Sequence, residues 1–215
     1  MHEKFFQIAR TNMVKNQILP NNVKEKGLIE ALLNTKKELF VPKEFHDLVY
    51  SDADIIFGEQ RFLIRTFIIA KMLEKCKFSK NNSILVVGCL TGYSIALISK
   101  LVNYVFGIDN DRDFVEMATK NIGDLNILNC SVYYKKDLST GLSRNAPYDK
   151  IFIEGSVNSI PTALIKQLKD DGEIYAVIKK EDSVGEFVRG LRVRSGLSFE
   201  KFFNTDVNIL EDFII

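Results

Sequence analysis

Two glycines and one acid at the ends of predicted strands are the residues of this chain best placed to do chemistry. The apolar run 84–87 leads into Gly88, and Gly92 follows where a helix with apolar positions begins. A second apolar run ends in Asp109, about twenty residues past the turn. At that spacing a carboxylate on the next strand tip can bind both ribose hydroxyls of a nucleoside. The pattern therefore predicts a nucleoside site.

The glycine spacing also indicates which nucleoside is meant. A dinucleotide fingerprint has three glycines and a P-loop has a lysine, and neither pattern is present, so phosphate binding is disfavoured. What remains resembles the first motif of S-adenosylmethionine-dependent methyltransferases, whose cofactor carries no phosphate. That resemblance implies cofactor contacts from Asp109 and from four residues of the turn: Gly88, Cys89, Thr91 and Gly92. The alternative is an ordinary glycine-containing turn of a doubly wound fold.

Composition sets limits on the class of protein. A chain of 215 residues with 46% hydrophobic and 27% charged residues is long enough for one substantial core, and we expect a single domain over 1–215. A net charge of +1 and the lack of a long apolar run argue against nucleic acid and membrane as partners. Two histidines and no CxxC make a metal site improbable. Three scattered cysteines suggest reduced thiols and a cytoplasmic location: Cys76, Cys89 and Cys130.

Hydrophobic periodicity divides the chain into a helical cap region over 1–80 and a sheet core over 81–215. The cap shows apolar spacings of three to five up to about Cys76. Strands are predicted at 84–87, 104–108, 131–134, 150–153 and 173–178. Helices are predicted between them at 93–101, 111–121 and 160–168. This alternation predicts an α/β fold with a doubly wound, mostly parallel Rossmann-like sheet. Residues 187–203, with a Ser195-Gly196 turn, predict an antiparallel C-terminal hairpin.

With these elements in place, the chain resembles the protein-L-isoaspartate (D-aspartate) O-methyltransferase family over nearly its whole length. No single short motif is specific, but their order and spacing match the family. The matching stretches are Met13-Val14-Lys15-Asn16-Gln17, Glu38-Leu39-Phe40-Val41-Pro42, Val49-Tyr50-Ser51-Asp52, Phe67-Ile68-Ile69-Ala70-Lys71-Met72, Gly92-Tyr93, Ala146-Pro147-Tyr148-Asp149-Lys150-Ile151, Ile160-Pro161 and Gln167-Leu168.

The resemblance implies methyl transfer from S-adenosylmethionine to the carboxylate of an isoaspartyl residue in a protein or peptide. The ester then closes to a succinimide that can reopen as normal aspartate, which is a repair reaction. Catalysis of this kind consists mainly of alignment and desolvation. The resemblance further assigns Asp137 and Leu138 to the adenine edge. Glu154, at another strand end, is either a cofactor or substrate contact or a loop acid.

The chain departs from the family at the acceptor site. The Thr and Ser of the family's Thr-x-Ser segment fall on Phe62 and Ile64, which cannot donate hydrogen bonds. Arg61 and Arg65 are nearby residues that could hold a carboxylate instead, although a basic segment before a helix is commonly just solvated surface. The catalytic residues therefore stay unassigned.

The cofactor loop departs as well, because Leu90 replaces a middle glycine and Val86 replaces an acid. Leu90 is compatible with cofactor binding if its φ is ordinary. Three functions stay open: isoaspartyl methyl transfer with a rebuilt site, methyl transfer to another acceptor, and a catalytically inert protein that binds cofactor or peptide. His46 and Cys89 have no evident catalytic partner in the sequence.

Overall fold

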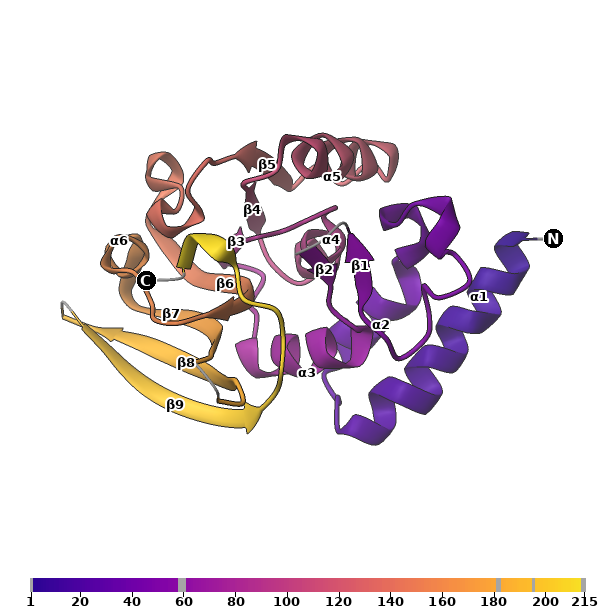
Figure 1. Cartoon of the computed structure of the whole chain (residues 1–215), viewed down its shortest axis with the longest axis horizontal. Coiled ribbons are helices and arrows are strands. Elements are labelled where there is room, and N and C mark those ends of the chain that lie inside the picture. Colours follow the sequence, from indigo (N-terminus) through magenta and orange to yellow (C-terminus); the bar gives the residue numbers. More distant parts are fainter. Residues whose placement is uncertain (1, 58–60, 181–182, 195, 214–215) are drawn as a thin grey trace.

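A computed structural model describes residues 2–57, 61–180, 183–194 and 196–213. Its larger sheet has the strand order β5-β4-β3-β6-β7-β8-β9 (Figure 1). The strands up to β7 pair in parallel, whereas β8 and β9 are antiparallel additions at one edge. The bounds are β3 (Ser83–Val87), β4 (Tyr104–Asp109), β5 (Cys130–Tyr134), β6 (Tyr148–Val157), β7 (Leu168–Ile178), β8 (Glu186–Val193) and β9 (Gly196–Asn204).

The order of the strands creates a switch point beside β3. The chain moves outward from β3 to β4 and β5, and then returns to the other side of β3 as β6. Open α/β sheets bind their ligands at the carboxyl ends of the strands at such a point. The ends of β3, β4 and β6 are therefore where a site is expected.

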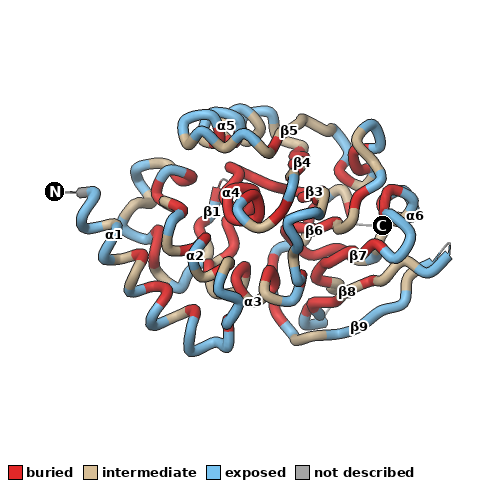
Figure 2. Tube along the Cα trace, turned by 180° about the vertical axis from the view of Figure 1, so that it is seen from behind, coloured by how far each residue is buried: buried red, intermediate tan, exposed pale blue. Residues whose placement is uncertain are grey.

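The centre of the sheet is almost completely shielded from solvent. Residues 84–87 of β3 are fully buried, which fits a central parallel strand covered on both faces. Helix α4 (Tyr93–Ser99) is buried on every side, and Figure 2 shows the buried residues gathered in α4 and the central strands. The elements that would carry the nucleoside site are thus the most enclosed ones.

Helices cover the sheet and form most of the N-terminal region (Figure 1). The Glu25 carboxylate caps α2, and the Asp111 carboxylate caps α5 by accepting the amides of Asp113 and Phe114. The bounds of the α-helices other than α4 are α1 (His2–Met13), α2 (Lys26–Asn34), α3 (Thr66–Cys76), α5 (Arg112–Asp124) and α6 (Thr162–Lys166). A π-helical turn η1 (Val14–Ile18) continues α1, and the remaining short helices are 3-10 turns: η2 (Leu19–Asn21), η3 (Lys37–Phe40), η4 (Lys43–Phe45), η5 (Leu138–Thr140), η6 (Ser143–Asn145) and η7 (Glu211–Phe213).

The prediction of an entirely helical region up to Cys76 is wrong. β1 (Ile55–Phe57) and β2 (Arg61–Leu63) form a small antiparallel sheet there. Each strand has three residues, too few for a recognisable period, and their pairing depends on packing around them. β2 carries Arg61 and Phe62 and is followed by Ile64, three of the residues that the sequence places at the acceptor site.

The predicted sheet core is confirmed in type and order. The predicted helix 160–168 is shorter in the structure, because α6 ends at Lys166 and β7 already begins at Leu168. The C-terminal hairpin is confirmed as β8 and β9, although Ser195 of its turn lies outside the described residues. Within the described residues, no helix is both long and apolar enough to span a membrane.

Beyond β9 the chain continues as residues 205–213, which we call the C-terminal tail. Figure 1 shows it in yellow, leaving β9 and crossing the sheet to a short helical turn. Ser156 of β6 donates its amide to the Asn208 carbonyl at 2.8 Å, and its own carbonyl accepts the Leu210 amide at 2.9 Å. The tail therefore pairs with β6 at the switch point of the sheet.

Candidate cofactor site

The turn after β3 has the backbone shape that glycine permits. Gly88 and Gly92 have φ values of 77° and 89°, in the left-handed region. Leu90 also has a positive φ, 48°, so its backbone keeps a glycine-like conformation and the condition of an ordinary φ is not met. A leucine in this region is strained by about 1 kcal/mol. The Leu90 amide is held by a 2.8 Å hydrogen bond to Asp109 Oδ2.

Asp109 ends β4 with its side chain fully buried, and its carboxylate is paired within the chain. Arg61 donates from Nη1 to Oδ1 at 2.8 Å and from Nη2 to Oδ2 at 2.7 Å. With the amides of Leu90 and Asp111 at 2.8 and 3.1 Å, the carboxylate accepts four hydrogen bonds. A carboxylate has about four acceptor positions, so Asp109 is saturated.

Arg61 is fixed in this position by several groups. Its Nη1 also donates to Asn110 Oδ1 at 2.9 Å, and its guanidinium lies 5.5 Å from the Phe114 ring centre. Burial alone lowers the pKa of Arg61, but the hydrogen bonds and charge of Asp109 outweigh it, and the pKa lies above its ordinary value. The guanidinium therefore stays charged.

Glu154 lies inside β6, next to the glycine turn, and is almost completely buried. The Ser94 hydroxyl, on α4, donates a hydrogen bond to its carboxyl group. Burial raises the pKa of Glu154 to about 8, while Ser94 and the Arg61 charge act in the opposite direction. The carboxyl group is therefore largely protonated near neutral pH, and it could donate as well as accept a hydrogen bond.

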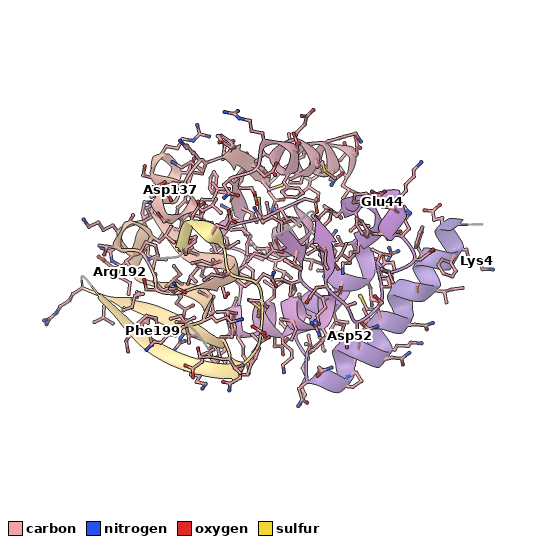
Figure 3. All side chains as sticks on the ribbon, in the orientation of Figure 1. Lys4, Glu44, Asp52, Asp137, Arg192 and Phe199 are labelled. Carbon is pink, nitrogen blue, oxygen red and sulfur yellow. The ribbon has the colours of Figure 1, made fainter. Side chains whose placement is uncertain are left out.

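The two residues assigned to the adenine edge differ in what they contact. Asp137, labelled in Figure 3 on the loop after β5, is exposed and accepts hydrogen bonds from the Ser139 amide and hydroxyl at 2.9 and 2.6 Å. This is a capping contact of the following turn. The buried Leu138 donates its amide at 3.0 Å to the carboxylate of Asp212, in the C-terminal tail. To bind adenine, the Leu138 amide would have to give up its hydrogen bond to Asp212.

The concave surface made by two glycines is also covered by the tail. A Cβ added at Gly88 would lie 3.0 Å from Leu210 Cδ1, and one added at Gly155 would lie 2.7 Å from Leu210 Cγ. Real Cβ atoms are rarely so close to another heavy atom, so Leu210 would have to shift if either residue carried a Cβ. The side chain of Leu210 thus lies against the turn.

The positions of the missing hydroxyls lie beside this turn. Phe62 and Ile64 line one small cavity together with Gly88, Leu90 and Glu154. Arg65 has a different partner: its guanidinium pairs with Asp54, at 2.9 Å between Nη2 and Oδ2. Both arginines proposed as carboxylate holders are therefore engaged with acids of the chain.

The remaining turn residues are buried. Burial raises the pKa of the Cys89 thiol well above its ordinary value, which argues against a reactive thiolate. The Thr91 hydroxyl is fully buried and has no hydrogen-bond partner among the described residues. His46 packs in the N-terminal region, with its ring centre 5.3 Å from that of Phe6.

These residues offer the chemical groups that S-adenosylmethionine needs. In this arrangement, however, they leave too little space for it. An acid at the end of β4, an amide after β5 and a glycine turn after β3 are the required groups. The cavity beside the glycine turn, which Arg61, Glu154 and Leu210 help to line, has a volume of about 20 Å³, whereas small-molecule pockets span about 300 to 1,000 Å³. About one water molecule would fill it. Cofactor binding at this position requires Arg61 and the tail to move.

Sequence reasoning missed the partners of these groups. The sequence suggests Arg61 either as a holder of the substrate carboxylate or as solvated surface, and it indicates no role for Leu210 or Asp212. The pairs join residues 48 and 74 positions apart in the chain, and no local pattern connects them. A usable signal was the apolar spacing of Val207, Leu210 and Phe213, all of them buried, in a segment beyond the predicted hairpin.

Comparison with known proteins finds relatives of one family. The family model described as Protein-L-isoaspartate(D-aspartate) O-methyltransferase (PCMT) matches residues 9–190. The chain is similar to a protein-L-isoaspartate O-methyltransferase of Dictyoglomus turgidum, with 31% identity over 82% of this chain and 80% of that one. It is also similar to the Ignicoccus hospitalis protein of the same name, with 27% identity over 89% of this chain and 92% of that one.

Two solved structures share the fold. A protein-L-isoaspartate O-methyltransferase superposes with a TM-score of 0.79 at 23% identity, over 98% of this chain and 66% of that chain. A Plasmodium falciparum protein of the same description, in complex with S-adenosyl-L-homocysteine, has a TM-score of 0.78 at 15% identity, over 96% of this chain and 98% of that chain. With the family model matched over most of its length, the chain belongs to the protein-L-isoaspartate (D-aspartate) O-methyltransferase family.

Proposed function

We propose that this chain transfers a methyl group from S-adenosylmethionine to the carboxylate of isoaspartyl residues in proteins or peptides, as a repair step. The observation that carries the proposal is the family match over residues 9–190. The site residues support it, because an acid, a backbone amide and a glycine turn lie together at the switch point of the sheet. We propose Gly88, Gly92, Asp109 and Leu138 as the main cofactor contacts.

Bound S-adenosylmethionine supplies an electrophilic methyl group, and the substrate carboxylate is already a nucleophile. The protein has to hold the acceptor, exclude water and avoid competing charges. Phe62 and Ile64 offer an apolar wall that strips water from a carboxylate but donates no hydrogen bond. The largely neutral Glu154 adds little repulsion against an incoming carboxylate near neutral pH. Turnover by such a site should be slow.

We propose protein and peptide substrates rather than nucleic acid, since a net charge of +1 gives no field to attract a polyanion. The free cysteines, all of them buried, support a reducing, cytoplasmic location.

The test is methyl transfer to an isoaspartyl peptide, with the matched normal aspartyl peptide as control. We expect slow transfer to the isoaspartyl peptide only. In the double variant Phe62→Thr/Ile64→Ser, which restores the family's two hydroxyls, transfer should rise about tenfold or more, because a hydrogen bond to a charged group contributes about 1.5 to 3 kcal/mol. Binding of S-adenosylhomocysteine without transfer in either protein would contradict the proposal.

A second candidate is a protein that binds cofactor or peptide without catalysis. The specific observation in its favour is that Phe62 and Ile64 stand at the hydroxyl positions while Arg61 pairs with Asp109. The same assay separates the two candidates, because this one predicts binding without transfer even after the hydroxyls are restored.

A further inference from the structure

The C-terminal tail contacts the very groups that the cofactor would need. Asp212 Oδ2 accepts hydrogen bonds from the Leu138 amide and from the Asn110 side-chain amide, both at 3.0 Å. A carboxylate oxygen is a hydrogen-bond acceptor, as a ring nitrogen of adenine is. Asp212 therefore fills the hydrogen-bonding position assigned to the adenine edge.

Arg61 fills the hydrogen-bonding position assigned to the ribose. Two neighbouring ribose hydroxyls donate a pair of hydrogen bonds to a carboxylate, and the planar guanidinium donates a parallel pair to the Asp109 oxygens, at 2.8 and 2.7 Å. The acid cannot accept both sets, since the Leu90 and Asp111 amides use its remaining acceptor positions. Ribose and Arg61 exclude one another.

Leu210 completes the occupation of the site. Its side chain packs against Gly88 and Gly155, where a Cβ on either residue would crowd it. The tail is held there by two backbone hydrogen bonds with Ser156 and by the Ser156 hydroxyl, which donates to the Val207 carbonyl at 2.9 Å. Tail backbone and tail side chains are thus both fitted to the pocket.

We propose that residues 205–213, together with Arg61, are an internal competitor of S-adenosylmethionine. The chain then has a closed state, in which the tail fills the pocket, and an open state that binds cofactor. The apparent affinity for cofactor equals the affinity of the open state multiplied by the fraction of molecules that are open. This inference rests on the proposed function, since it assumes that the pocket binds cofactor when open.

Competition of this kind has a reciprocal consequence. A change that destabilises the closed state makes cofactor binding more favourable by the same free energy. This holds until most molecules are open even without cofactor. Asp212→Ala removes two hydrogen bonds that the closed state alone makes. It should tighten S-adenosylhomocysteine binding about tenfold, which corresponds to about 1.4 kcal/mol.

The experiment is calorimetric titration of the full chain with S-adenosylhomocysteine, comparing wild type, Asp212→Ala and Glu211→Ala. Glu211 is the matched control, because it is the adjacent acid of the tail and is exposed. Asp212→Asn, which keeps an acceptor oxygen, provides an intermediate case if the alanine variant does not fold. Circular dichroism confirms that each protein is folded.

Tighter binding by Asp212→Ala, with Glu211→Ala equal to wild type, supports the proposal. Measurable binding by the Asp212 variant alone supports it too. Equal affinity in all proteins overturns the internal competitor and leaves the proposed function standing. No binding by any folded protein overturns both, so the two failures are distinguishable.

Discussion

Two clusters of buried charged side chains in this molecule differ in where the fold places them. In the N-terminal region, Arg10 contacts Glu38 at 3.5 Å and the Tyr50 hydroxyl at 3.1 Å, and that hydroxyl donates to Glu38. At the switch point of the sheet, Arg61 pairs with Asp109. The first cluster ties together segments that are distant in sequence. The second closes a surface that this family of folds uses for ligands.

The comparison teaches that buried charge alone does not mark a functional site. The N-terminal cluster has no glycine turn beside it and no partner supplied by the tail among its described contacts. The pocket cluster lies beside the glycine turn, and Asn110, which accepts a hydrogen bond from Arg61, donates one to Asp212 of the tail. Its charged groups stand where ligand contacts are expected. Burial, together with the hydrogen bond to Glu38, raises the pKa of Tyr50, as it does for many structural tyrosines. Position in the topology is the more informative criterion.

Replacing Asp109 gives the largest expected effect. Asp109→Ala leaves the mostly buried Arg61 guanidinium without its carboxylate, so the free energy of unfolding should fall by about 3 kcal/mol. It should also weaken S-adenosylhomocysteine binding, since the ribose loses its acceptor. Urea unfolding and calorimetry measure the two effects. Asp113→Ala, an exposed acid in the first turn of α5, should change stability by only a few tenths of a kcal/mol. Equal losses in both variants would contradict the ion-pair account.

The N-terminal cluster should affect stability alone. Glu38→Gln weakens the hydrogen bonds from Arg10 and Tyr50, and we expect a loss of about 2 kcal/mol in the free energy of unfolding. The affinity for S-adenosylhomocysteine should stay within twofold of wild type, a change of about 0.4 kcal/mol. Glu44→Gln, an exposed acid labelled in Figure 3, is the control and should be neutral in both measurements. A clear loss of ligand affinity in Glu38→Gln would remove the distinction between the clusters.

Glu154 makes the pocket cluster sensitive to pH. Burial raises its pKa from 4.5 to about 8, so the folded chain holds this proton more tightly than the unfolded chain. Its stabilising contribution is therefore complete below pH 4.5 and is lost as the pH rises towards about 8. Within that window the free energy of unfolding should fall by up to about 1.4 kcal/mol per pH unit.

Glu154→Gln is the variant that tests this dependence. It keeps a hydrogen-bonding partner for Ser94 but cannot ionise, so its stability should depend less on pH than that of wild type across the same window. Urea unfolding at about pH 5, pH 6 and pH 7 measures the slopes. Parallel slopes for the two proteins would contradict a buried, proton-binding Glu154.

The sheet core and the contacts that close the pocket differ in how far the sequence could predict them. The sheet core follows from local patterns, because runs such as 84–87 alternate with helical periodicity and parallel strands need crossovers. Gly88 and Asp109 meet for the same reason, since adjacent parallel strands end at one edge. The contacts that close the pocket have no local pattern. Arg61 and Asp212 reach their partners through three-residue strands and a tail whose positions are set by tertiary packing.

Hydrogen exchange at the Leu210 amide tests the central claim most directly. This amide donates to the Ser156 carbonyl at 2.9 Å in the closed state. If cofactor displaces the tail, saturating S-adenosylhomocysteine should speed exchange at Leu210 about tenfold or more, while Val87 in the buried β3 stays protected. Such a local increase is opposite to the protection that ligand binding usually gives. Unchanged or slower exchange at Leu210 in the ligand-bound protein would contradict the account.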